Sequence, residues 1–198
     1  MALSRFEQNL GRASEMIDLE QSVGRITTSA VDLSDLLRAA LVAGVSALDF
    51  FVHEYVREGM LNIYTGSRPP TDAYNAFVVP MSAVNIAISS SPGNTVWFDE
   101  VVREAHGWKS FQHPDKIKAA VRLISTKELW HEVSDELSSD VPTVKSELVA
   151  IVDRRNKIAH EADMDPTYPG TLWPINEPLV RHALAFLGAI ARAIDSRI

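Results

Sequence analysis

The sequence contains no cysteine among its 198 residues. Disulfides, thiolate-bound metals and cysteine nucleophiles are therefore excluded. The longest apolar run, AALVAGVSALDFFV at residues 39–52, is interrupted by Ser46 and Asp49 and is too short to cross a bilayer. The N-terminal stretch MALSRFEQNLGRASEMIDLE lacks the apolar core and basic flank of a secretory signal. We therefore expect a cytoplasmic protein with no membrane partner.

Positive charge is also scarce, because 19 Lys and Arg face 26 Asp and Glu, for a net charge of −7. This balance is evidence against a broad surface that binds nucleic acid independently of sequence, since such binding depends mostly on neutralising phosphates. A small local anion site is still compatible with it. The densest basic cluster consists of Arg154, Arg155 and Lys157. Any site for an anion is therefore expected there.

The apolar residues recur at helical spacing along the chain, which predicts an all-α bundle in a single domain, residues 1–198. The segment at 27–60 is apolar on nearly every side around its middle, so we expect a central helix that ends near Gly59. Residues 62–93, rich in Gly, Pro and Ser, predict a loop-rich insertion around a short helix near 81–88. Further helices are expected within 3–23, 95–107, 113–124, 125–139, 141–163 and 176–195.

The stretch VDRRNKIAHEAD, residues 152–163, combines an apolar helix face with several polar side chains. On an ideal helix Arg155 lies about 20° from Val144, in the centre of the apolar face. Arg154 falls at the edge of that face, within reach of Glu147. A guanidinium on a buried face must be paired or held for a purpose. Asp49 is the predicted partner, an anion in a cleft is the alternative, and the two are compatible.

Asn156 and His160 are four residues apart and share one side of the helix, next to Arg155. The three line one edge of the helix end with a fixed cation, an amide and a side chain that exchanges protons near neutrality. This set suits phosphodiester cleavage in RNA. His160 would act as general acid or base, Arg155 would stabilise charge on the phosphate, and Asn156 would orient either group. Arg154 and Lys157 would add supporting charge, and the chemistry requires no metal or other cofactor.

A structural interpretation competes with this one: Arg155 paired with Asp49 in the core, and His160 idle on the surface. The wider sequence favours the catalytic interpretation. RNKIAH, residues 155–160, resembles the ribonuclease signature of the HEPN superfamily, in which Arg and His are separated by four to six residues, often with a polar residue after the Arg. DLLRAALVAGVSALDFFVHEYVRE, residues 35–58, is similar to the second helix of the RiboL-PSP-HEPN group.

The resemblance implies an all-α bundle that pairs as a homodimer and brings two Arg–His motifs into one composite cleft. It also implies metal-independent RNA cleavage that leaves a 2′,3′-cyclic phosphate, in a toxin or antiviral-defence effector with an antitoxin or other regulatory partner. Some HEPN domains lack nuclease activity. The alternative is therefore a non-catalytic module that dimerises or binds a nucleotide or a partner protein.

Two other groups of residues are candidates for a site. His53 lies four residues after Asp49 and is followed by Glu54 and Arg57, and we interpret these as the polar edge of a buried helix. The stretch at 97–111 mixes aromatic and basic residues, a combination that can stack nucleic-acid bases. Packing in the core and loops is the favoured interpretation of its aromatic side chains.

Overall fold

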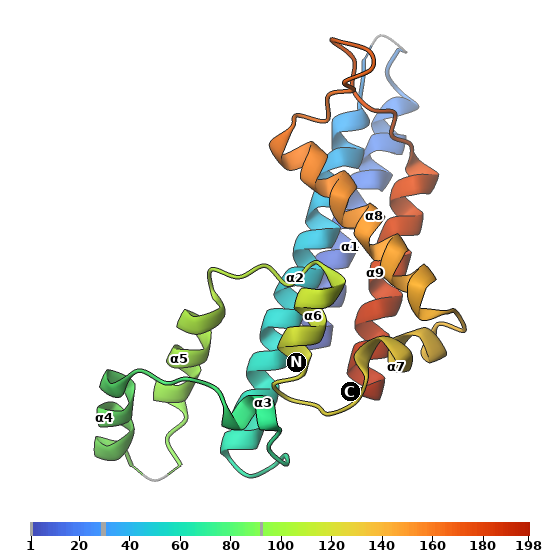
Figure 1. Ribbon diagram of the computed structural model, residues 1–198. Coiled ribbons are helices and arrows are strands. Elements are labelled where there is room, and N and C mark those ends of the chain that lie inside the picture. The colour runs from blue at the N-terminus through green and yellow to red at the C-terminus, as the bar shows by residue number, and fades with distance from the viewer. Residues whose placement is uncertain (1, 29–30, 92) are drawn as a thin grey trace.

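The computed structural model describes residues 2–28, 31–91 and 93–198, and these residues form nine α-helices (Figure 1). Within the described residues there is no strand, only an isolated antiparallel bridge between Met164 and Leu172. The all-α fold class expected from the sequence is therefore confirmed. The helices are α1 (Ala2–Gly24), α2 (Ser34–Tyr64), α3 (Asp72–Asn75), α4 (Met81–Ser89), α5 (Val96–His106), α6 (Pro114–Val121), α7 (Leu129–Glu136), α8 (Val141–His160) and α9 (Glu177–Arg197).

Helix α2 is the central element of the bundle. It contacts α1, α5, α6, α8 and α9, and α8 crosses the long helices obliquely (Figure 1). Leu48 and Phe51 are completely buried, and each contributes about 1.5–3 kcal/mol of hydrophobic stabilisation. Gly44 lets α9 approach closely, because a Cβ there would lie 2.2 Å from Leu184 Cδ2. A helix that is apolar all round is thus enclosed by others, as its sequence predicts.

By length and composition α2 would also pass as a membrane-spanning helix, in contrast to what the interrupted run at 39–52 suggests. Its most apolar 18-residue window has a mean hydropathy of 1.6, but 56% of that window is buried inside the protein. Such burial is typical of the core helix of a folded bundle.

The predicted end of α2 at Gly59 is wrong, because the helix continues to Tyr64. Gly59 serves packing instead: a Cβ there would lie 2.7 Å from Ile124 Cγ2, in the turn after α6. The glycine therefore marks a close approach between two elements and does not end the helix.

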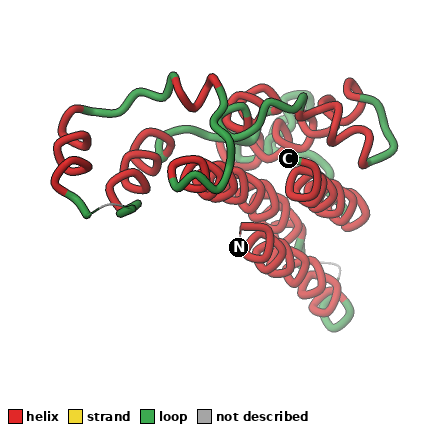
Figure 2. The backbone as a smooth tube through the Cα atoms, turned by 90° about the horizontal axis from the view of Figure 1, so that it is seen from below, coloured by secondary structure: helices red, strands yellow, loops and turns green. Residues whose placement is uncertain are grey.

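The segment between α2 and α6 projects from one side of the bundle (Figures 1 and 2). The short helix expected near 81–88 is α4, although Pro92 of the predicted insertion lies outside the described residues. Helix α5 anchors this segment through the buried side chains Phe98 and Val102. Most of α4 is exposed, including Met81 and Ile88.

Helix α8 carries the motif, and its start is fixed by local chemistry. Asp140 is the N-cap and accepts the backbone N–H of Thr143 at 2.9 Å. Pro142 follows in the first turn, where its missing N–H costs little. Val144, Leu148, Ile151 and Val152 are buried against the bundle. This face sets the orientation of the polar residues in the last two turns.

Candidate functional site

The chain turns back sharply where α8 ends. The backbone N–H groups of Glu161 and Asp163 both donate to the carbonyl of Lys157, at 2.9 and 3.0 Å. Ala162 and Asp163 adopt positive φ values of 51° and 55°. The Trp173 N–H then donates to the Asp163 carbonyl at 2.9 Å, which ties the following loop back to the helix end. As a result, the Asp163 carboxylate lies against the helix that the chain has just left.

Arg154 is held at this turn, so its predicted position at the edge near Glu147 is wrong. Its Nη2 donates to Asp163 Oδ2 at 2.9 Å and to the carbonyls of Trp173 and Pro174 at 3.1 and 3.2 Å. Burial lowers the pKa of Arg154, and a second arginine nearby acts in the same direction, while Asp163 opposes both. The prediction that only Arg155 of the pair faces inward is therefore also wrong.

The second arginine is Arg38 of α2, which binds the same carboxylate oxygen. Its Nε donates to Asp163 Oδ2 at 2.6 Å, and its Nη2 donates to the Trp173 carbonyl at 3.0 Å. The Asp163 side chain is 1% exposed and that of Arg38 is 8% exposed. Two cations thus share one buried anion, and this Arg38–Asp163–Arg154 cluster clamps the end of α8 to α2. An open hollow of about 530 Å³ lies beside it, lined in part by Ile158 and Ala162.

Arg155 is half-buried, but it does not pair with Asp49 as the sequence suggested. The Asp49 carboxylate instead accepts the backbone N–H of Phe111 at 2.5 Å, and it lies 4.0 Å from His53 Nε2. Nη1 of Arg155 donates to the Oδ1 of Asn156 at 3.0 Å. Its Nε is buried and has no hydrogen-bond partner among the described residues. No carboxylate among the described residues forms an ion pair with Arg155.

The rest of the motif lies in the last two turns of α8. Asn156 is half-buried, whereas His160 is exposed in the final turn. Lys157 Nζ stands 4.9 Å from the centroid of the Trp173 ring, a cation–π contact that directs it toward the loop after α8. His160 is five positions after Arg155, so on an ideal helix the two side chains leave the axis about 140° apart. The motif residues are neighbours at the end of α8, where Arg155 bonds to Asn156 and the backbone geometry directs His160 to a different side of the helix from Arg155.

Sequence reasoning missed Arg38 and Asp163, although a signal for Arg38 was present. Arg38 is a lone charge within the apolar stretch LLRAALV, and a charge on a buried helix face requires a partner. Asp163 follows the helix, where helical spacing no longer indicates the direction of a side chain.

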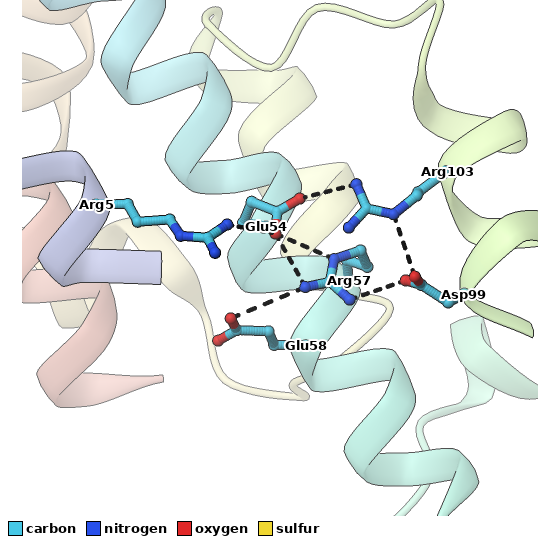
Figure 3. A network of polar contacts seen from close by, with 6 residues as sticks. All are labelled: Arg5, Glu54, Arg57, Glu58, Asp99 and Arg103. Atoms are coloured by element: carbon cyan, nitrogen blue, oxygen red, sulfur yellow. Dashed lines mark hydrogen bonds and ion pairs between the residues drawn. The ribbon is translucent and has the colours of Figure 1, made fainter. Parts of the chain in front are cut away.

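A separate ion-pair network joins α1, α2 and α5 (Figure 3). Glu54 is 5% exposed. Its carboxylate forms ion pairs with Arg57 at 2.9 Å, Arg103 at 3.3 Å and Arg5 at 4.0 Å. Asp99 bridges Arg57 and Arg103 at 2.8 and 3.2 Å. The polar edge predicted for this part of α2 thus carries a network, centred on the buried Glu54, that fastens α5 to the bundle.

In a comparison with protein families, the model described as RiboL-PSP-HEPN matches residues 7–198. The match includes α8 with its motif and α2 with Arg38. Comparisons with curated proteins and with solved structures give no match.

Proposed function

The chain belongs to the RiboL-PSP-HEPN family, and from this premise we propose that it is a metal-independent endoribonuclease whose active site forms between two copies of the chain. The observation that carries the proposal is the end of α8. There Arg155, held by Asn156 and lacking a carboxylate partner among the described residues, lies near the exposed His160. A cation that no described carboxylate neutralises suits an anionic substrate.

In the proposed reaction the 2′-oxygen of a ribose attacks the adjacent phosphorus while one His160 takes the 2′-hydroxyl proton. The bond from phosphorus to the 5′-oxygen breaks, and that oxygen receives a proton from His160 of the second copy. The products are a 2′,3′-cyclic phosphate and a 5′-hydroxyl. Arg155 stabilises the charge that develops on the phosphate oxygens. Asn156 accepts a hydrogen bond from Arg155 and so orients the guanidinium.

The angular separation within α8 supports an active site shared by two copies. On an ideal helix, side chains about 140° apart start out toward different sides of the helix axis. A twofold axis near the end of α8 would bring Arg155 of one copy toward His160 of the other, since a symmetric interface uses the same patch twice. We therefore propose a homodimer as the active form. The biological role that we attach to it, a cytoplasmic toxin or antiviral-defence effector under the control of a regulatory partner, rests on the family.

A second candidate function is a non-catalytic module that binds a partner protein. The exposed apolar side chains of α4 favour it: Met81 is 72% exposed and Ile88 is 79% exposed. Such a module would keep the fold and have no use for His160.

Cleavage of structured RNA in the presence of EDTA separates the two candidates. We expect the wild type to cut, and His160→Ala to cut at least about 100-fold more slowly, as for the loss of a general acid or base. His131→Ala is the matched control, because His131 is exposed on α7, away from the motif. Mass analysis of the products should show cyclic phosphate ends.

Unfolding temperatures of all three proteins confirm that each variant folds. A wild type that leaves RNA intact in EDTA would contradict the ribonuclease proposal and favour the binding module. Equal cleavage by wild type and His160→Ala would remove His160 from the mechanism.

A further inference from the structure

A second hollow is lined by the end of α5, the loop that follows it, α6 with the turn after it, and Phe77. Its volume of about 530 Å³ falls within the range of roughly 300–1,000 Å³ that is usual for small-molecule sites. Neither the motif at the end of α8 nor the Arg38–Asp163–Arg154 cluster belongs to it. We call this hollow the α5–α6 pocket.

Aromatic rings form much of the wall of the α5–α6 pocket. The His106 ring stands edge-on to Phe77 and to Phe111, with centroids 6.0 and 5.5 Å apart. Trp108, also in the lining, is 81% exposed, so the predicted packing of this residue in the core or a loop is wrong. An exposed indole beside an apolar hollow offers a flat face for another ring to stack on.

The charge of the α5–α6 pocket is positive. Lys109 and Lys116 are the only charged residues in the described lining, and His106 does not add to them. Burial, helped by Lys109 and His53, lowers the pKa of His106 to about 4, so this side chain is neutral at pH 7. Lys109 Nζ lies 5.5 Å from the centroid of the Trp108 ring.

Nearby lysines behave differently from these two. Lys118 pairs with Glu128 at 2.6 Å, and Lys145 pairs with Asp115 at 2.9 Å. Within the described parts of the chain, Lys109 and Lys116 form no ion pair with an acidic side chain. The protein has a net charge of −7, so two lysines without an acidic partner beside an apolar hollow mark this place as suited to an anion.

The chemistry that complements this pocket is a planar ring attached to an anion. A nucleotide has both: its base would stack among the rings, and its phosphate would reach the lysines. A base paired in a duplex presents no free face, so the nucleotide must be unpaired. The lining also contains a buried polar atom, the Nδ1 of His106, which has no hydrogen-bond partner among the described residues.

We propose that the α5–α6 pocket receives an unpaired base of the RNA, with the adjacent phosphate held by Lys109 and Lys116. This inference rests on the proposed function for the identity of its ligand. Helix α6 contacts both α2 and α8, so the pocket and the motif helix belong to one packed framework. The pocket would thereby select single-stranded positions in a substrate that the motif then cuts.

Binding is measured separately from cleavage, on proteins that all carry His160→Ala, with a fluorescently labelled single-stranded RNA oligonucleotide and anisotropy as the readout. Adding Trp108→Ala should weaken binding about 10-fold or more, as expected for one stacked base. Trp108→Phe keeps a ring and should recover most of the affinity. Lys109→Gln with Lys116→Gln should weaken binding. It should also reduce the slope of log K against log[salt] by about 0.7 for each phosphate contact that is lost.

The matched control for charge is Lys118→Gln with Lys145→Gln, which also removes two positive charges but at lysines paired with Glu128 and Asp115. It should change the affinity less than Lys109→Gln with Lys116→Gln does. Two further ligands test the source of the nucleotide: a fully paired duplex and free 5′-AMP. Both should bind more weakly than the single strand. Tighter binding of free 5′-AMP would overturn the RNA assignment.

Single-strand binding that is absent, or unchanged by Trp108→Ala, would overturn the inference even if the wild type cleaves RNA. Binding that depends on Trp108 and on both lysines supports the pocket even if the wild type does not cleave. The two proposals therefore fail independently.

Discussion

Asp163 is the residue on which the end of α8 depends most. Its carboxylate is 1% exposed and accepts hydrogen bonds from Arg38 and Arg154, so it offsets two cations that water barely reaches. Removing one partner of a buried ion pair leaves the other charge without compensation, at a cost of about 3–5 kcal/mol. Asp163 therefore contributes more to stability than an exposed acid on the preceding helix, α8.

We predict that Asp163→Asn lowers the free energy of unfolding by about 3 kcal/mol. Asparagine preserves the shape and tolerates the positive φ of 55°, so the loss reports the missing charge and not a strained backbone. Urea denaturation measures the difference. Asp153→Asn, on the exposed side of α8, makes the same change of charge and should stay within about 0.5 kcal/mol of the wild type.

A similar loss in both variants would show that overall charge, and not the Arg38–Asp163–Arg154 cluster, determines the effect. Equal stability of Asp163→Asn and the wild type would show that the buried charges are compensated in another way.

The two arginines of α8 show what the sequence can predict about single residues. Helical spacing correctly indicates the buried apolar face of α8, because that face follows from local geometry. It fails for Arg154 because the partner, Asp163, lies beyond the end of the helix. The chain turns back there through two residues with positive φ, which brings Asp163 to Arg154. It fails for the Asp49–Arg155 pair because a backbone N–H at Phe111, 62 residues away, occupies Asp49. Partners distant in the chain are not encoded in helical spacing.

At the scale of elements, the turn after α8 stores conformational strain. Ala162 has φ of 51°, a left-handed conformation that costs an L-residue about 1–2 kcal/mol, whereas glycine adopts it freely. Glycine also adds entropy to the unfolded chain, which costs about 0.4–1 kcal/mol. The first effect is the larger of the two.

We therefore predict that Ala162→Gly raises the free energy of unfolding by up to about 1 kcal/mol. Ala150→Gly, at an exposed position inside α8, should lower it by about 1 kcal/mol, because there glycine only weakens the helix. Thermal unfolding of both variants shows the sign. A loss of stability in both would mean that the turn adapts to Ala162 without strain.

The helices themselves follow from the sequence because their causes are local. Apolar spacing, the Asp140 cap and Pro114 in the first turn of α6 all act within a few residues of one another. The end of α2 does not follow, since Gly59 responds to Ile124, which the fold brings to it from 65 positions later. A glycine selected for close packing cannot be distinguished in the sequence from one that ends a helix.

At the scale of the whole molecule, the chain combines a rigid bundle with two separate polar systems. The network around Glu54 fastens α5 to α2 (Figure 3). The cluster around Asp163 fastens α8 to α2. The α5–α6 pocket and the motif are therefore both attached to α2. On an ideal helix the side chains of Arg155 and His160 leave α8 in directions about 140° apart.

If two copies share an active site, an inactive copy should abolish the activity of the wild-type copy with which it pairs. We expect that wild type co-refolded with a ninefold excess of the Arg155→Ala, His160→Ala double variant loses roughly tenfold in cleavage per wild-type chain, because most wild-type chains then pair with an inactive copy. A site complete within each chain would keep its full activity in the mixture. The control replaces the double variant with His131→Ala, which should add its own activity and reduce none. Unchanged cleavage per wild-type chain, with mixed dimers demonstrated by mass spectrometry, would show that Arg155 and His160 act within one copy.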